Sequence, residues 1–474
     1  MTSTPHQDQD SPVEKSHERL SPSSTTFQDA PSEITVWEAF MYWLKLGFIS
    51  FGGPAGQIAI MHQDLVERKR WISEKRFLHA LNYCMVLPGP EAQQLATYIG
   101  WLMHRTWGGV IAGGLFVLPS LFILVALSWI YIAFGDLPVV AGLFYGIKPA
   151  VTAIVIQAAH RIGSRALKNS WMWAIAAASF VAIFALNVPF PAIVLAAALI
   201  GYLGGRFAPE RFKTGSGHSA GKQSYGPALI DDHTPTPDHA KFRWSYLLTV
   251  AAVGTLLWAV PMLLLTASLG WGHTLTQMAW FFTKAALLTF GGAYAVLPYV
   301  YQGAVSSYGW LTPTQMIDGL ALGETTPGPL IMVVAFVGFV GGYQSAEMQS
   351  LMMGGNKFLA GALAASLVTW FTFLPSFIFI LAGGPMVEST HDQLKFTAPL
   401  TAITAAVVGV ILNLALFFLY HVLWPESFKG RFDWIAALIA IGAAFALFKL
   451  KRSVIQVLAT CALIGLTLKM IGLV

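Results

Sequence analysis

Two lysines and two glycine pairs recur at one fixed spacing in a chain that is otherwise almost wholly apolar. Lys45 precedes Phe51-Gly52-Gly53 by six residues, and 239 residues later Lys284 stands in the same relation to Phe290-Gly291-Gly292. A lysine inside a membrane segment costs at least about 2.5 kcal/mol, and glycine pairs leave backbone N–H groups open to oxyanion oxygens. The pattern predicts a binding site for an anion. Snorkelling lysines and close helix packing around glycine are the structural alternatives.

The same offset links Pro88-Gly89-Pro90 to Pro327-Gly328-Pro329. Proline removes a backbone donor and frees carbonyls one turn earlier, so both segments are expected to break a helix at membrane depth. Glu91 directly follows the first break, and Glu324 precedes the second. Both carboxylates are candidates for binding a coupled proton. Glu324 is preferred, because Glu91 at a helix start is equally well explained by the helix dipole.

Uncharged side chains near the breaks add donors suited to a tetrahedral oxyanion, although polar contacts between membrane helices are their commoner use. The candidate substrate-binding residues are Lys45, Phe51, Gly52, Gly53, Gln57, Pro88, Gly89, Pro90, Gln93, Lys284, Phe290, Gly291, Gly292, Thr325, Pro327, Gly328 and Pro329, with Asn82, Gln94 and Thr97 ranked behind them. His62, His79 and Asp318 are expected to face solvent without a chemical role. No metal-ligand spacing, Ser-His-Asp order or phosphate-binding glycine loop is present, so no enzyme, cofactor or metal site is predicted.

Composition places the chain in a membrane. Of its 474 residues 55% are hydrophobic and only 11% are charged, which excludes an ordinary soluble domain of this length. The net charge of +5 is concentrated in loops, so the expected partner is the lipid bilayer and not a nucleic acid. Cys84 and Cys461 lie far apart in apolar runs, which favours packing roles over a disulfide.

Nine apolar stretches are long enough to cross a bilayer at about 20 residues each. They lie near 108–133, 139–160, 171–187, 190–205, 245–267, 357–383, 397–420, 432–449 and 453–472. Four further stretches, 37–66, 78–103, 276–305 and 315–342, are interrupted by Phe-Gly-Gly or Pro-Gly-Pro. We interpret these four as broken, re-entrant hairpins, with single crossings as the alternative.

Loop charge predicts how the two halves are oriented. Cytoplasmic loops carry the excess of positive charge, and the basic loops hold Arg68, Lys69, Arg70, Lys75, Arg76, His104, Arg105, Arg161, Arg165, Lys168 and the stretch 206–243. The first basic loop surrounds Trp71. Its repeat equivalent, residues 306–315 around Trp310, has no Lys or Arg. The halves are therefore expected to be inverted, with 245–267 supplying the odd crossing.

The predicted fold is an all-α polytopic membrane protein with two inverted-topology repeats. Each repeat contains two broken, re-entrant helical hairpins followed by about four transmembrane helices, and one extra span joins the repeats. The expected segments are a disordered polar tail at 1–35, the first repeat at 36–205, a basic cytoplasmic linker at 206–243, a connecting helix at 244–270 and the second repeat at 271–474. The tail shows no cleaved signal peptide and is expected to be cytoplasmic.

Two local signals support the repeat. Ser73 and Thr312 are expected to be helix N-caps, and Pro313 follows at the first helical position. Beyond Pro329 the strict offset is lost, but Leu118-Pro119-Ser120 and Leu374-Pro375-Ser376 still correspond after an insertion of about 17 residues. Each half is therefore expected to continue into the same series of spans.

These motifs resemble the chromate ion transporter family, in its long-chain, two-domain form. The resemblance rests on Phe51-Gly-Gly-Pro54, the Trp71 loop, Leu87-Pro-Gly-Pro90 with Glu91-Ala-Gln-Gln94, and their echoes at Phe290-Gly-Gly and Thr326-Pro-Gly-Pro329, and covers about 37–472. One departure is that Ala293-Tyr294, and not Pro-Ala, follows the second glycine pair. The two half-sites therefore need not bind equally.

The resemblance implies a multi-pass inner-membrane protein that exports chromate, a tetrahedral dianion, and so confers chromate resistance. A negative-inside potential favours anion exit by about 2.3 kcal/mol per charge per 100 mV, so export driven by the membrane potential, by protons or by both needs no ATP. The alternatives are an importer or exchanger of sulfate or another tetrahedral oxyanion, and a membrane-embedded chromate reductase, whose redox centre two distant cysteines cannot build. A homodimer is one assembly compatible with the resemblance.

Overall fold

The structure is a computed structural model that describes residues 31–212, 225–389, 397–426 and 430–474. Most of the predicted tail and residues 213–224 of the predicted linker lie outside these ranges. Within them the chain is helical, and the one strand-like contact is an isolated bridge between Ile72 and Ile230. The all-α class and its polytopic character are confirmed.

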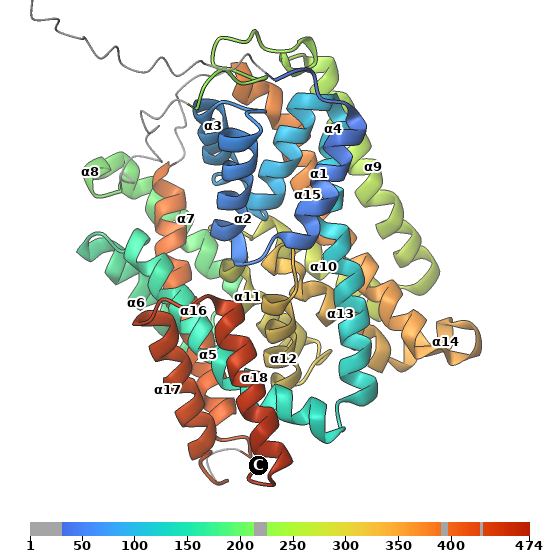
Figure 1. Cartoon of the computed structure of the whole chain (residues 1–474), viewed down its shortest axis with the longest axis vertical. Helices are drawn as coiled ribbons and strands as arrows, with labels where there is room; N and C mark the ends of the chain where they lie inside the picture. The colour runs from blue at the N-terminus through green and yellow to red at the C-terminus, as the bar shows by residue number, and fades with distance from the viewer. Residues whose placement is uncertain (1–30, 213–224, 390–396, 427–429) are drawn as a thin grey trace, which may run out of the picture.

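The first half begins with three short helices around the breaks and continues into longer spans (Figure 1). Its helices are α1 (Val36–Ile49), α2 (Gly53–His62), α3 (Glu74–Cys84), α4 (Glu91–Phe134), α5 (Pro138–Ala166), α6 (Ser170–Phe184), α7 (Phe190–Phe207) and α8 (Pro209–Phe212). After the linker, α9 (Trp244–Leu269) leads into the second half. That half contains α10 (Thr274–Leu287), α11 (Ala293–Tyr301), α12 (Pro313–Thr325), α13 (Val333–Gln344), α14 (Ala346–Leu351), α15 (Lys357–Ser389), α16 (Thr397–Leu423), α17 (Trp434–Phe448) and α18 (Val454–Met470).

All four interruptions occur where the motifs predict them. Helix α1 ends at Ile49 before the first glycine pair, and α10 ends at Leu287 before the second. At the two Pro-Gly-Pro segments, Gly89 has a φ of 134° and Gly328 a φ of 105°. These values lie in the region that only glycine adopts without strain, so the chain does not continue as a helix through either segment.

The second half repeats the local structure of the first. Both expected N-caps are confirmed, because the Ser73 hydroxyl accepts from the Arg76 amide and Thr312 forms a capping box with Gln315. A π-helical turn covers Gln63–Arg68, and another covers Gln302–Ser307 at the same offset of 239. Such turns are rare in helices, so their recurrence is structural evidence for duplication.

The insertion in the second half has a structural location. Helix α4 loses helical geometry at His104 and Arg105, and the piece that continues to Phe134 packs back against the piece before this point, with Gly108 beside Gly100 and Gly113 beside Thr97. In the second half the corresponding stretch is divided into α13 and α15, and the short helix α14 lies between them. The extra residues therefore enter at the place where the first half turns back on itself between two packed helical pieces.

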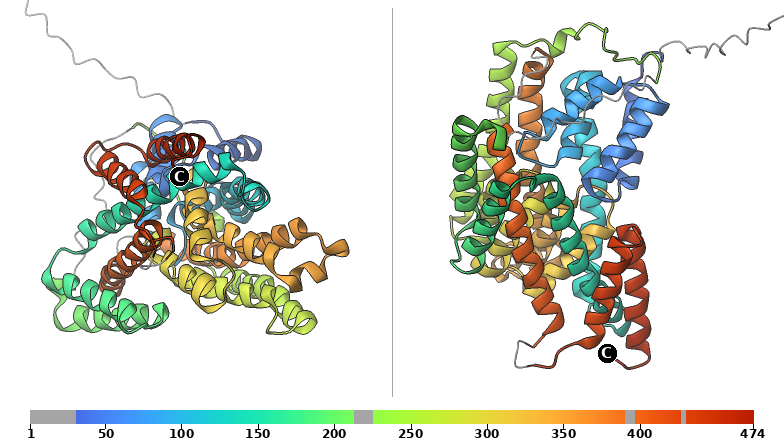
Figure 2. Two further views of the ribbon diagram at one scale, coloured as in Figure 1. Left: turned by 90° about the horizontal axis from the view of Figure 1, so that it is seen from below. Right: turned by 90° about the vertical axis from the view of Figure 1, so that its left-hand side faces the viewer.

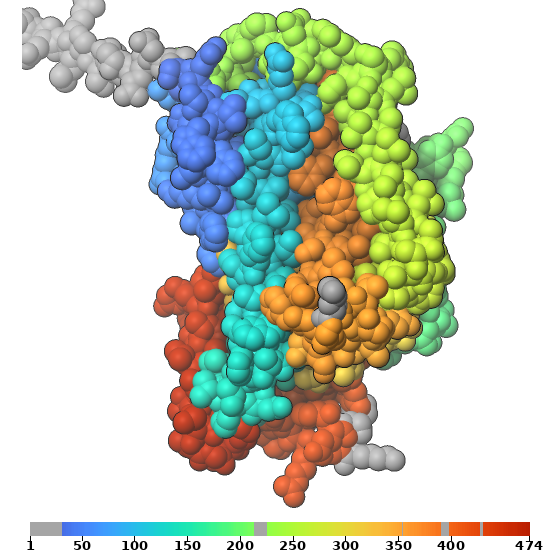
Figure 3. Space-filling model, turned by 90° about the vertical axis from the view of Figure 1, so that its right-hand side faces the viewer, coloured from blue at the N-terminus to red at the C-terminus, as the bar shows by residue number. Residues whose placement is uncertain are grey.

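Six described helices are long and apolar enough to cross a membrane, namely α4, α5, α7, α9, α15 and α16. Helices α6, α17 and α18, which the sequence predicts as full spans, have 15 to 17 residues each. Helix α9 lies on one flank and exposes Leu248, Leu256 and Leu263, each at least 59% accessible. Its inner side covers α15, which packs beside α4 (Figure 3). Exposed leucines on most of its surface suit a lipid-facing span.

The remaining helices pack around α5. Helices α16, α17 and α18 all contact it, and α17 and α18 form a pair at the end of the molecule that also holds the C-terminus (Figure 2). Helix α3 lies toward the opposite end, and α12 lies between it and the α17–α18 end (Figure 1). The broken segments from both halves lie between these ends.

Candidate functional site

The broken segments of one half bond to those of the other half. The Gly89 amide donates to the Thr289 carbonyl at 2.7 Å, and the Gly328 amide donates to the Ser50 carbonyl at 2.8 Å. These two bonds are related by the offset of 239, since it converts Ser50 to Thr289 and Gly89 to Gly328. Each Pro-Gly-Pro segment is thus paired with the residue that precedes the Phe-Gly-Gly of the other repeat. We call this arrangement the crossing.

Each Pro-Gly-Pro also lies against a long helix of the other half. A Cβ atom at Gly89 would stand 2.3 Å from the Ser376 hydroxyl, and one at Gly328 would stand 2.8 Å from the Ser120 Cβ. Ser120 and Ser376 end the two Leu-Pro-Ser motifs. Glycine is therefore required at both positions by close approach as well as by backbone geometry.

Three glutamines support the crossing. Gln57 donates to the Gly328 carbonyl at 2.5 Å, and Gln94 donates to the Pro88 carbonyl at 2.8 Å. Gln93 donates to the Thr97 hydroxyl at 2.9 Å. All three amide oxygens are buried and have no hydrogen-bond partner among the described residues. The crossing therefore retains hydrogen-bonding capacity that the protein itself does not use.

The repeated lysines lie away from these bonds. Lys45 is exposed on α1, and the Lys284 ammonium lies 5.6 Å from the centre of the Trp280 ring on α10. No hydrogen bond or ion pair between described residues connects either lysine to the crossing. That Lys45 and Lys284 meet around one anion stays a prediction.

Helix α5 brings two arginines to the carboxylates that follow and precede the breaks. Glu324 accepts a hydrogen bond from the Tyr294 hydroxyl, and the guanidinium of Arg161 lies 5.9 Å from the centre of the Tyr294 ring. Arg161 is also the charged neighbour of Glu324, and Arg165 is that of Glu91. The sequence analysis treats both arginines as loop charges. Their spacing of four residues, which places them on one helix face, is the sequence signal for this role, and it was not used in predicting the site.

Asp318 differs from its prediction as a solvent-facing residue. It is only 2% exposed, accepts a hydrogen bond from the Tyr131 hydroxyl at 2.8 Å and forms an ion pair with Lys148 at 3.5 Å. It borders a cavity of about 450 Å³ that Lys148 and Lys469 also line. The prediction was wrong because α12 packs against α4 and α5, a contact that residue type does not reveal. His62 and His79 are half-buried.

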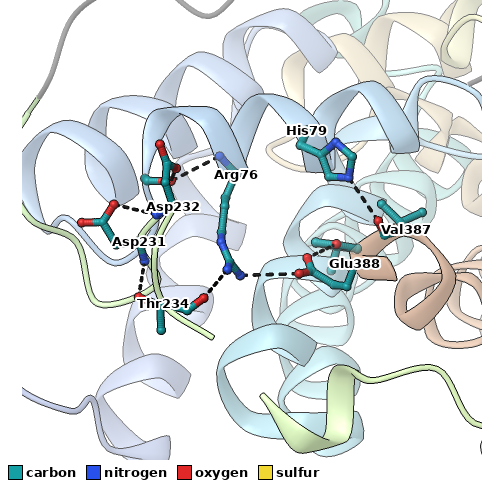
Figure 4. Close-up of polar contacts among 9 residues, drawn as sticks. Arg76, His79, Asp231, Asp232, Thr234, Val387 and Glu388 are labelled. Atoms are coloured by element: carbon teal, nitrogen blue, oxygen red, sulfur yellow. Dashed lines mark hydrogen bonds and ion pairs between the residues drawn. The ribbon is translucent and has the colours of Figure 1, made fainter. Parts of the chain in front are cut away.

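The linker is attached to the start of α3 (Figure 4). Arg76 donates to the Thr234 carbonyl at 2.5 Å and forms an ion pair with Glu388 of α15 at 3.4 Å. Glu388 also accepts from the Tyr98 hydroxyl at 2.5 Å, and the Ser73 hydroxyl donates to Asp232 at 2.5 Å. This cluster ties the linker, α3, α4 and α15 together at one end of the molecule.

Known proteins match both halves of the chain. The family model described as chromate transporter matches residues 37–202 and again 276–466. The chain is 33% identical to a chromate transport protein of Pseudomonas aeruginosa, covering 84% of each chain, and 29% identical to one of Cupriavidus metallidurans, covering 91% of this chain and 93% of that protein. A probable chromate transport protein of Synechococcus elongatus is 28% identical and covers 89% and 93%. No solved structure matches the chain.

The two family matches coincide with the two halves that carry the breaks, and the gap between them contains the linker and α9. The matches are therefore to the whole membrane body and not to one motif. With its paired breaks and its multi-pass helical fold, the chain belongs to the chromate transporter family.

Proposed function

We propose that the protein is a secondary carrier that exports chromate across the inner membrane by alternating access. The observation that carries the proposal is the crossing, in which the glycines at positions 89 and 328 make equivalent bonds to opposite repeats. Carriers built from inverted repeats bind substrate at such broken helices near the membrane midplane. Chromate is proposed as the substrate because two of the similar proteins are named chromate transport proteins.

The proposed repeats are residues 36–205 and 271–474, joined by the linker 206–243 and by the span at 244–270. The N-terminus and the linker are cytoplasmic in this proposal. The substrate site uses Phe51-Gly52-Gly53, Phe290-Gly291-Gly292 and the two Pro-Gly-Pro segments, with Lys45 and Lys284 attracting the anion. Glu324, and secondarily Glu91, would bind the coupled proton, while the membrane potential favours exit of the dianion.

Transport can be measured with labelled chromate in inverted membrane vesicles that contain the protein. We expect accumulation in these vesicles, and we expect Lys45→Ala and Lys284→Ala to reduce it without loss of protein. Lys241→Ala is the matched control, because Lys241 lies in the linker and pairs with Asp238 on the surface. Normal accumulation by both membrane-lysine variants would eliminate their proposed role. Cells that become more chromate-sensitive on expression would indicate import.

The inverted arrangement has a separate test. Single cysteines in the loops 67–76 and 302–315 should react with a membrane-impermeant thiol reagent from opposite sides of the membrane. If both loops react from the same side, the repeats are not inverted. The five basic residues of the 67–76 loop predict that it is cytoplasmic. Labelling of this loop from the cytoplasmic side would therefore also support the proposed orientation of the N-terminal half.

A further inference from the structure

Among the described residues, the two arginines that neighbour the carboxylates beside the breaks both come from α5, a helix of the first repeat. Arg161 and Arg165 lie one turn apart and are the charged neighbours of Glu324 and Glu91, one carboxylate from each repeat. By the offset that aligns the Leu-Pro-Ser motifs, the position equivalent to Arg161 on α16 is Phe417. The position equivalent to Arg165 is His421, so the repeated lysines occur in both halves but these two guanidinium groups do not.

The guanidinium of Arg161 has unused hydrogen-bonding capacity. It lies over the Tyr294 ring at 5.9 Å, and within the described ranges no hydrogen bond or ion pair holds it. An arginine presents five N–H donors in a planar fork that matches two oxygens of a tetrahedral oxyanion. Arg161 is half-buried, so a ligand that reaches it loses part of its water.

Tyr294 connects this guanidinium to the second break. It is the second residue of α11, which begins directly after the glycine pair, and its hydroxyl donates a hydrogen bond to Glu324. The first turn of a helix has amides without helical partners, and these favour an anion. In the first repeat the equivalent position is Ala55, which has no hydroxyl and no ring. The geometry therefore exists in one half-site only.

Glu324 is close to Arg161 without forming an ion pair with it. The described ion pairs include none between these residues, although Arg161 is the charged neighbour of Glu324. An oxyanion at the guanidinium would repel this carboxylate, so the two negative groups would compete for one cation.

We infer that Arg161, the Tyr294 ring and the first turn of α11 form the binding site for a dianionic tetrahedral oxyanion, and that Glu324 competes with this ligand for Arg161. This inference rests on the proposed function, because it names the residues that recognise the transported anion. It assigns recognition of the bound anion to one asymmetric half-site, toward which the repeated lysines attract the anion.

The test is binding of chromate, and separately of sulfate, to the full-length protein in detergent, measured by isothermal titration calorimetry. Arg161→Ala should weaken binding by at least about tenfold, the usual result of removing a charged partner from a desolvated contact. Arg161→Lys should be intermediate, because it keeps the charge and loses the fork. Arg211→Ala is the matched control, since Arg211 lies 5.6 Å from the Trp171 ring on the outer surface of the bundle.

Glu324→Gln provides a readout that misfolding cannot imitate. It removes the competing charge, so it should bind the oxyanion at least as tightly as the unmodified protein. Weaker binding by Glu324→Gln, or unchanged binding by Arg161→Ala, overturns the inference even if chromate transport is observed. If the unmodified protein binds neither anion, the inference and the proposed function both fail. If it binds sulfate alone through Arg161, the site stands and the chromate assignment fails.

Discussion

Glu388 is a buried carboxylate whose two partners come from different helices. It is 7% exposed and is held by Arg76 and by the Tyr98 hydroxyl. Glu388→Ala would leave a buried hydroxyl and an arginine without their acceptor, a loss that typically costs about 3 kcal/mol. We expect a clearly lower thermal unfolding midpoint for the purified protein.

The matched control for Glu388 is Asp238→Ala, because Asp238 also pairs with a cation but lies on the surface with Lys241. Solvent screens such pairs, so no measurable change in the midpoint is expected. If Glu388→Ala has the same thermal unfolding midpoint as the unmodified protein, this cluster does not stabilise the fold.

The two Pro-Gly-Pro segments should respond alike to an added methyl group. Gly89→Ala and Gly328→Ala each place a Cβ under 3.0 Å from a serine of the opposite repeat, in a backbone conformation that costs about 1–3 kcal/mol for other residues. We expect both variants to unfold at lower temperature and to lose chromate uptake. Gly114→Ala is the control, because a Cβ at that position of α4 meets open space.

Equal stability of Gly89→Ala and Gly114→Ala would contradict the close approach at the crossing. A large effect at Gly89 with none at Gly328 would contradict the equivalence of the two breaks. All three variants are purified and melted in the same way. Because each adds one methyl group to a glycine, a difference between them reports the local contact at that glycine.

Two ion pairs lie toward opposite ends of the molecule and join the short helices to the long spans. Arg76–Glu388 connects α3 to α15, and Lys148–Asp318 connects α5 to α12. In an alternating-access carrier, each end must open in turn. Removing an interaction worth about 1.4 kcal/mol shifts such an equilibrium about tenfold.

We therefore expect opposite changes in access to the crossing. In a chain without its two native cysteines, Met85→Cys provides the probe, because Met85 is 42% exposed beside the first Pro-Gly-Pro. Arg76→Ala should increase its labelling by an impermeant thiol reagent from the α3 side, and Lys148→Ala should increase labelling from the other side. Identical changes from both sides would mean that the ion pairs only stabilise the fold.

The sequence by itself determined the features that depend on neighbouring residues. Apolar length predicts the spans, glycine and proline predict the four breaks, and Ser73 and Thr312 predict helix starts, because each signal acts within a few residues of chain. The repeat offset also predicts that Gly89 and Gly328 are equivalent. These features are set by backbone chemistry that is the same in any fold.

Only the tertiary structure decided which distant segments meet. It pairs Gly89 with Thr289 and Gly328 with Ser50, buries Asp318 beside Lys148, and brings Arg161 to Tyr294. Each of these contacts joins residues more than 130 positions apart. They depend on how whole helices pack, and packing is set by the summed shape of many side chains, which no local pattern encodes.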